Sequence, residues 1–448
     1  MFEKRRSVFR WPVCAVSVLF LSLALGAAMQ LTSVPADPGV RGGAPRAGGS
    51  IAGLTLKEGK FFATGQDAFV EVQSVQGAIA GTEVGLGPRF NLDSCGGCHS
   101  QPAIGGTSPS VNPQVGVANK NGATNTVPFF ILINGPVREA RFKSDGGVHD
   151  LFTITGRTDA PGCNIAQPDF DAAGADLIFR IPTPTFGAGL IEAITDSTIL
   201  ANKKDPPVMG VSGRENREGN AGTITRFGWK AQNKSLVIFS GEAYNVEQGV
   251  TNELFPQERG ETPSSCLLNA TPESHMNFED TNPLKVSGDT ENFSNFMRFL
   301  APPAPVSSYV SSVVGNVGTT SINNGAFQFN AVGCTLCHKQ SMTTGFSSTA
   351  ALNGRTANLF SDLLLHDMGD GLRDDILQGA AGPRDFRTAP LWGLGQRLFF
   401  LHDGRTSNLL DAIQAHSSNG SEANTVISNF NLLSPGQKQD VLNFLRSL

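Results

Sequence analysis

The sequence predicts a mainly α-helical protein in which two similar segments flank an inserted region of short strands and loops. Two pentapeptides of the pattern C-x-x-C-H, at residues 95–99 and 334–338, mark the two segments. Between them, from about residue 126 to residue 225, β-branched and aromatic runs alternate with turn residues, which is typical of short strands. Helical spacing of apolar residues follows at 229–254, 292–300 and 434–448.

Each pentapeptide offers two thiols one helical turn apart and a histidine directly after them. This pattern predicts a covalent c-type haem, in which the thiols bind the two vinyl groups and the histidine is the proximal ligand of the iron. Two copies arise by chance about once in a million chains of this composition. A zinc site or a dithiol is the simpler alternative, but zinc wants four clustered ligands and a dithiol does not use the histidine. The residues assigned to two covalently bound haem c groups, in two cytochrome c-like domains, are Cys95, Cys98, His99, Cys334, Cys337 and His338.

Residues 1–34 have the composition of an export signal. A basic cluster at residues 4–10 precedes an apolar run at residues 11–29, which small residues follow. An uncleaved membrane anchor is the alternative, because the run approaches membrane-spanning length. Haem attachment to C-x-x-C-H takes place outside the bacterial inner membrane, so the signal and the pentapeptides both predict the periplasm. No other membrane contact is expected.

The rest of the chain is long enough for two or three domains. Residues 35–50 are rich in proline and glycine and are expected to form a flexible linker. The prolines at 301–305 cannot continue a helix, so they are the expected boundary between an N-terminal haem domain, 51–305, and a C-terminal haem domain, 306–448. The formal net charge of −5 makes nucleic acid a poor partner.

Two cysteines remain after the pentapeptides and Cys14 of the signal are set aside. Because the predicted compartment is oxidising, Cys163 and Cys266 are expected to form a disulfide. Two unrelated buried thiols are the alternative.

The sequence resembles a known family over almost the whole chain after the signal. The matching stretches include RFNLDSCGGCHSQPAIGG, GVHDLFTITGR, PTPTFGAGLIEAI, TRFGWKAQNKSL, GEAYNVEQGVTNELF and LLLHDMG. They resemble the family called di-haem oxidoreductase, putative peroxidase, formerly described as thiol-oxidoreductase-like. Residues 386–416 are also similar to the C-terminal segment of bacterial di-haem cytochrome c peroxidases and of methylamine-dehydrogenase maturation enzymes.

The resemblance implies ligands for the C-terminal haem. In the related enzymes the residue fourteen after the histidine of the HDG motif, here His402, is the sixth iron ligand, and that position is His416. Met368 is the alternative. Histidine in place of methionine would lower the reduction potential, because imidazole is the stronger donor to ferric iron. Arg387 and Arg405 are candidate partners of the haem propionates, and a surface role is the alternative for each.

For the N-terminal haem we expect an open or water-bound iron, because no histidine follows His99 closely. Three distant residues could still fold back as ligands, namely His149, Met209 and His275. Calcium between the haems occurs in relatives, but it is not expected here, because Arg397 and Phe399 replace the residues that offer carbonyl groups.

Three residues are candidates for the reaction itself. Trp229 has the spacing of the tryptophan that lies between the haems of the peroxidases, although a buried helix anchor is equally consistent with the sequence. Peroxide cleavage needs a group that moves a proton. Glu247 lies within two residues of the relatives' distal glutamate, and Glu192 is an independent candidate. Their distal glutamine is lost, because its position holds Phe239.

The resemblance implies an exported oxidoreductase of the peroxidase type. A periplasmic donor, such as a small cytochrome c or a cupredoxin, would supply electrons through the C-terminal haem to an oxidant, such as hydrogen peroxide, at the N-terminal haem. One alternative is a non-enzymatic electron relay with two saturated irons. Another is an enzyme that oxidises or matures a partner protein.

Overall fold

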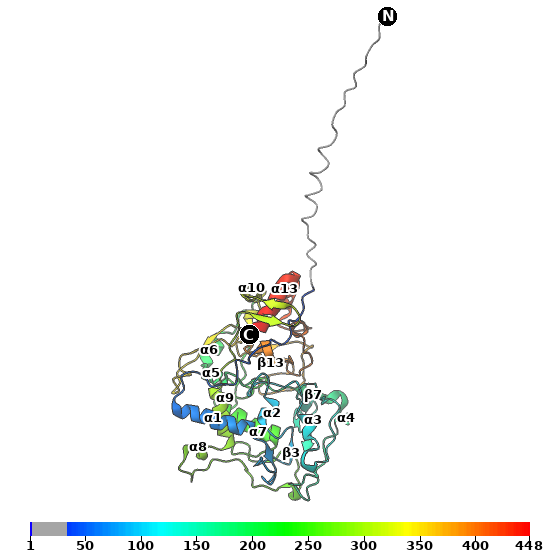
Figure 1. Ribbon diagram of the computed structural model, residues 1–448, viewed down its shortest axis with the longest axis vertical. Helices are drawn as coiled ribbons and strands as arrows, with labels where there is room; N and C mark the ends of the chain where they lie inside the picture. The colour runs from blue at the N-terminus through cyan, green and yellow to red at the C-terminus, as the bar shows by residue number, and fades with distance from the viewer. Residues whose placement is uncertain (2–33) are drawn as a thin grey trace.

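The computed structural model describes residue 1 and residues 34–448, so the predicted signal lies outside the described residues. Helices make up 29% of the structure and strands 12% (Figure 1). The prediction of a mainly α-helical protein was therefore too strong. Glycine and proline, with 51 and 26 copies, interrupt most of the chain and leave short elements joined by turns.

The helices of more than four residues are α1 (Leu56–Val70), α5 (Ala188–Ala193), α6 (Asp196–Leu200), α7 (Leu236–Gln248), α9 (Asp289–Phe299), α10 (Thr319–Ala331), α11 (Leu409–Gln414), α12 (Asn424–Leu432) and α13 (Pro435–Ser447). One-turn helices are α2 (Cys95–Cys98), α3 (Gln114–Val117), α4 (Phe170–Ala173) and α8 (Pro283–Val286). The 3-10 helices are η1 (Lys120–Gly122), η2 (Gly174–Asp176), η3 (Ser264–Cys266), η4 (Cys334–Leu336) and η5 (Leu394–Gln396).

The strands are short and pair in small sheets. The pairs are β1 (Gln73–Ser74) with β2 (Glu83–Val84), β3 (Arg89–Phe90) with β6 (Phe152–Thr153), β8 (Tyr309–Ser311) with β9 (Gly315–Val317), β10 (Met342–Thr343) with β11 (Thr356–Ala357), and β12 (Leu365–Asp367) with β13 (Asp385–Arg387). One sheet has three antiparallel strands in the order β5 (Val148–His149), β4 (Glu139–Phe142) and β7 (Leu177–Arg180). This sheet lies between the two pentapeptides in sequence, which confirms the expected strand region.

Two helix pairs form the framework of the molecule. Helices α10 and α13 pack together at one end, and α1 packs on α9 towards the other (Figure 1). Gly65 of α1 and Gly325 of α10 lie at these contacts, where a Cβ atom would collide with backbone carbonyls of the partner helix. Glycine therefore allows the close approach of each pair.

Helix boundaries follow the capping residues. Helix α7 begins at Leu236, later than the expected residue 229, because Ser235 caps it by accepting a hydrogen bond from the Ile238 amide (3.3 Å). It ends at Gln248, and the capping residue that follows, Gly249, adopts a left-handed φ of +71°. The C-terminal helix has the expected start, since Ser434 is its N-cap and a capping box is present.

Residues 35–50 are not the flexible linker that their composition predicted. Asp37 accepts hydrogen bonds from Nε (2.8 Å) and Nη2 (2.7 Å) of buried Arg446 in α13. The amide of buried Arg41 donates to the carbonyl of Gly395 (2.7 Å). These specific polar contacts hold the segment along the C-terminal part of the chain.

The apolar core does not stop at the prolines of residues 301–305. One buried cluster contains Phe296 and Leu300 of the N-terminal part together with Leu359 and Leu363 of the C-terminal part. The prolines end α9, and the division into two domains at this point stays a prediction. Within the described residues, no helix has the length and apolar character needed to span a membrane.

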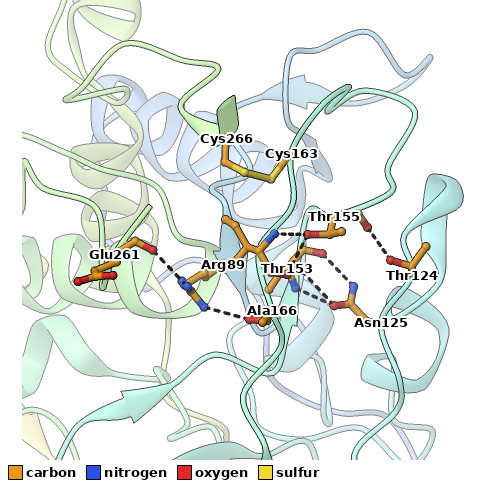
Figure 2. Close-up of a disulfide and its surroundings, with 10 residues drawn as sticks. Arg89, Thr124, Asn125, Thr153, Thr155, Cys163, Ala166, Glu261 and Cys266 are labelled. Carbon is orange, nitrogen blue, oxygen red and sulfur yellow. Dashed lines mark hydrogen bonds between the residues drawn. A yellow bond between two sulfur atoms is a disulfide. The ribbon is translucent and has the colours of Figure 1, made fainter. Parts of the chain in front are cut away.

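A disulfide joins Cys163 to Cys266, which confirms the pairing expected for the two cysteines outside the pentapeptides and the signal. Figure 2 shows Arg89 beside this bond, where it donates to the carbonyls of Ala166 (3.5 Å) and Glu261 (3.2 Å). The same two loops are thus linked by a covalent bond and by one side chain. Together these contacts fix the strand region against the segment that follows α7.

Candidate functional site

The first pentapeptide borders a cavity of about 1030 Å³. The first four residues of the pentapeptide form the single turn of α2. Ser94 caps this turn by accepting a hydrogen bond from the Gly97 amide (3.2 Å). The cavity wall is mostly apolar and contains the thiols of Cys95 and Cys98 and the ring of His99. Its other polar side chains include Arg138, Glu139, Arg141, Arg180, Gln232 and Glu247.

The two thiols of this wall are free, although the chain forms a disulfide elsewhere. Burial raises the pKa of Cys95 to about 12 and that of Cys98 well above its ordinary value. Gln248 donates a hydrogen bond to the sulfur of Cys95 (3.0 Å). Two neutral thiols facing one cavity suit covalent attachment of a group that fills it.

The His99 ring has the orientation of a metal ligand. Its Nδ1 donates to the carbonyl of Gly106 (2.9 Å), which fixes the tautomer and leaves Nε2 with a free lone pair. Burial lowers the pKa of His99, so the ring is neutral. A neutral imidazole held through Nδ1 is the usual geometry for binding iron through Nε2.

A pair of carboxyl groups lies in the same cavity. Glu247 hydrogen-bonds to Glu139, and Glu139 accepts from Nε of Arg141 (2.5 Å). Burial and then the charge of Glu139 raise the pKa of Glu247 well above its ordinary value. Burial also opposes ionisation of Glu139, but Arg141 and Arg180 outweigh it and lower the pKa of Glu139. The cavity therefore holds one carboxylic acid beside one carboxylate.

The described residues that line this cavity offer few iron ligands besides His99. The hydroxyl of Tyr244 is engaged, because it donates to Asp289 (2.9 Å) and accepts from Gln73. Met297 belongs to α9, which packs on Phe69, and Phe69 contacts the His99 ring edge with centroids 5.9 Å apart. The thioether of Met297 is therefore the other candidate iron ligand named in the described lining.

The structure places four other sequence candidates outside the first cavity. His149 hydrogen-bonds to Asp145 (2.9 Å), and His275 and Met209 are exposed. Glu192, the second candidate carboxylate, is not part of this lining either. One of its oxygens accepts from the Leu236 amide at the start of α7 (2.8 Å) and the other from Arg298 Nε (2.9 Å).

The second pentapeptide borders a larger cavity of about 1290 Å³. Cys334 and Cys337 are again free, and burial raises the pKa of Cys334 to about 12. The wall is more apolar than that of the first cavity, with side chains from α10, α11, α12 and α13, including Phe329, Leu409, Ile413, Val426, Ile427 and Leu445. Such a wall excludes water from the group that it encloses.

Two histidines of this second wall are ready to bind the same metal. Nδ1 of His338 donates to the carbonyl of Phe360 (3.0 Å), and Nδ1 of His416 donates to that of Ala412 (2.8 Å). Both rings keep Nε2 free. Burial, followed by the proximity of His416, lowers the pKa of His338 to about 4. The two rings thus interact across one cavity, as the His416 assignment requires. Met368 also lies in this lining.

His366 is a charged structural residue of the second wall. Nδ1 donates to Glu422 (2.8 Å) and Nε2 donates to Asp362 (3.0 Å), so carboxylates engage both nitrogens. Burial alone would lower its pKa, but Cys337 and Asp362 raise it well above its ordinary value. Although burial raises the pKa of Glu422, the hydrogen bond from His366 lowers it to about 2.

Glu422→Gln is expected to destabilise the fold at neutral pH by about 2 kcal/mol, because the buried imidazolium loses one of its two carboxylates. The folded pKa of Glu422 is about 2, below the ordinary value of 4.5, so its contribution is present above about pH 5. That contribution is lost as the pH falls towards 2. Urea unfolding at neutral and acidic pH measures it. The difference between wild type and variant should shrink in acid, whereas Asp403→Asn in a surface ion pair should change little.

Trp229 connects the two cavities. A smaller hollow of about 560 Å³ lies between them, and Trp229 lines all three spaces. Its Nε1 donates to the carbonyl of Ile181 (2.9 Å), which fixes the ring. His402 packs edge-on against Trp229, with centroids 6.4 Å apart, and stacks on Phe386 at 4.3 Å. The indole expected between two haems therefore lies between the two cavities.

Two buried arginines border the hollow and the second cavity, and neither has an acidic partner in the part of the chain that the structure describes. Arg387 donates to the carbonyls of Gly228 (3.0 Å) and Thr388 (3.3 Å), and Arg397 makes no side-chain hydrogen bond within the described residues. Burial lowers the pKa of each to about 10. Arg405, the other candidate, does not line either space and pairs with Asp403 at the surface (2.7 Å), which is the alternative that the sequence left open for it.

The residues present fit two haem c groups. Each cavity has two free thiols, a histidine with a free Nε2 and an enclosing apolar wall. Arg387 and Arg397, which have no acidic partner within the described residues, border the second cavity and would suit the propionates of such a group. Sequence reasoning missed Arg397 and Glu139 because nothing in their local sequence shows that they face a cavity.

Comparisons with known proteins identify one family and several solved structures that are distantly similar, two of which follow. The family model described as "Di-haem oxidoreductase, putative peroxidase" matches residues 156–448, which include the second pentapeptide but not the first. A hydrazine synthase structure from Kuenenia stuttgartiensis is 18% identical, with a TM-score of 0.23, over 37% of this chain and 56% of that one. A MauG-like protein associated with microbial copper homeostasis is 14% identical, with a TM-score of 0.28, over 57% of this chain and 89% of that one. This chain therefore spans little more than half of the hydrazine synthase chain. The search of curated proteins found no match.

Proposed function

The chain belongs to the di-haem oxidoreductase, putative peroxidase family, and from this premise we propose that it is a periplasmic peroxidase-type enzyme with two covalent haem c groups. The single observation that carries the proposal is the inequality of the two cavities. His338 and His416 both present a free Nε2 to the second cavity, whereas His99 alone does so in the described lining of the first.

The residues of each cavity have separate roles in this proposal. When bound, the haem irons supply the electron transfer and the reduction of the oxidant. His338 and His416 would both hold the iron of the second cavity, which would close it to reagents. His99 would hold the iron of the first cavity and would leave a position for an oxidant such as hydrogen peroxide. Glu247 is placed to donate and recover the proton that peroxide cleavage requires.

The path between the cavities passes through side chains of this chain. Trp229 is fixed between them by its hydrogen bond to Ile181 and offers an aromatic step for electrons. Arg387 and Arg397 would neutralise propionates at the same place. The electrons would come from a small periplasmic cytochrome c or cupredoxin. Export is supported by the basic and apolar leader, and the disulfide is consistent with an oxidising compartment.

The test is peroxide-dependent oxidation of a reduced small cytochrome c, together with haem content from a pyridine haemochrome assay and intact mass. We expect two thioether-linked haems per chain and steady turnover. Two haems without any peroxide-dependent oxidation would contradict the enzyme and leave an electron relay. Fewer than two attached haems would contradict the proposed cofactor content.

His416→Ala is expected to abolish the low-spin ferric signal of the second haem, because the iron loses its second strong ligand. Met368→Ala is the matched control, since Met368 lines the same cavity and was the alternative ligand. Electron paramagnetic resonance of the oxidised variants distinguishes the two assignments. Loss of the signal in Met368→Ala, with retention in His416→Ala, would show that methionine is the ligand.

A further inference from the structure

The two carboxyl groups of the first cavity, Glu139 and Glu247, differ in how they contact positively charged side chains. Glu139 of β4 accepts a hydrogen bond from Arg141 Nε (2.5 Å) and lies opposite Arg180 in the register of β4 and β7. The Glu247 side chain hydrogen-bonds to Glu139, but within the described residues it accepts no hydrogen bond from a cation. The negative charge therefore belongs on Glu139 and the proton on Glu247.

The other charged groups around Glu247 are engaged elsewhere. Asp150 accepts hydrogen bonds from Arg259 Nη1 (2.7 Å) and from Asn91 (3.2 Å). Arg180 pairs with Asp374 (2.5 Å). The remaining ionisable groups near the pair are Glu242, Cys95 and Cys98, and the two thiols become thioethers when haem is attached.

We propose that Glu139 is a positioning residue that keeps the proton on Glu247, so that the first cavity presents a carboxylic acid to its oxidant at neutral pH. This proposal rests on the proposed function and deepens it. The O–H bond of Glu247 breaks as its proton passes to an oxygen of the bound oxidant. Two adjacent carboxylates then repel each other, so the pair recovers a proton from water and returns to its starting state.

The geometry also predicts what removing Glu139 does. Arg141 and Arg180 would lose the carboxylate that they now stabilise, and their charge would favour ionisation of Glu247 instead. Burial of Glu247 would still oppose ionisation, but without the repulsion from Glu139. Glu247 in Glu139→Gln should therefore bind its proton at least about tenfold more weakly, a shift of about one pH unit.

The experiment is an infrared pH titration of the oxidised holoprotein, which follows the carbonyl band of protonated carboxylic acids and its shift in deuterated water. The Glu247 band is identified by its loss in Glu247→Gln. In Glu139→Gln its midpoint should move to lower pH by about one unit. Glu139→Asp keeps the charge, so its Glu247 midpoint should lie between those of Glu139→Gln and the wild type. This variant also keeps the test available if the glutamine variant does not fold.

Glu71→Gln is the matched control, because burial raises the pKa of Glu71 to about 7 and this residue does not line the cavity. It should not move the Glu247 midpoint. An unchanged midpoint in Glu139→Gln, or no Glu247 band in the wild type, would overturn the proposal. Cyanide binding is measured in parallel. A wild type that binds no cyanide would contradict the open first iron, while the infrared result would still decide the role of Glu139.

Discussion

Glu247→Gln is expected to lower peroxide turnover by about 10²- to 10⁴-fold, the usual contribution of a positioned proton donor. Glutamine keeps the size and a hydrogen-bonding group but has no acidic proton. The loss should appear in kcat as well as in kcat/KM, because the proton moves during the chemical step. Stopped-flow or steady-state oxidation of a reduced small cytochrome c by peroxide measures both constants.

The matched control is Glu192→Gln, since Glu192 was the competing candidate and caps α7 outside both cavities. It should retain most of the turnover, and its haem content and ferric spectrum should match those of the wild type. Undiminished turnover in Glu247→Gln would contradict the assigned role. A large loss in Glu192→Gln, with an unchanged spectrum and normal stability, would point to the wrong carboxylate.

Removing the disulfide with Cys163→Ser and Cys266→Ser together is expected to cost about 4 to 5 kcal/mol of unfolding free energy. The bond closes a loop between residues 103 apart in sequence, and a loop of that length greatly restricts the unfolded chain. Both cysteines are replaced so that no new free thiol can react with the four cysteines of the pentapeptides. Urea unfolding of the variant and of the wild type measures the difference.

A reduced wild type provides a second measurement of the same bond. It should unfold at a urea concentration close to that of the double variant. A loss below about 1 kcal/mol in both would show that local contacts, such as those of Arg89, fix the two loops without the bond.

Features with a local chemical signature could be predicted from the sequence. The two pentapeptides border cavities, and the Cys163–Cys266 pair is joined. Ser434 and Pro435 correctly marked the start of α13. His416, which lines the second cavity, could be proposed as a ligand only because a related segment gave its distance from His402. The pentapeptides and the helix cap depend on residues that lie close together in the sequence. The disulfide follows from the number of cysteines that remain.

Features that depend on distant parts of the chain could not be predicted. The proline- and glycine-rich segment at residues 35–50 looked flexible, because its partner Arg446 lies at the other end of the sequence. Glu192 looked like a free loop carboxylate, but its partners are in α7 and α9. Glu139 and Arg397 were missed for the same reason, since only the fold brings them to the cavities.

The proposed difference in coordination between the two irons is tested most directly by electron paramagnetic resonance of the oxidised holoprotein with two attached haems. The geometry predicts one high-spin ferric signal, from the haem held by His99 alone, and one low-spin signal, from the haem held by His338 and His416. Two low-spin signals would contradict this assignment, because both irons would then be saturated and the first cavity would have no position open to an oxidant.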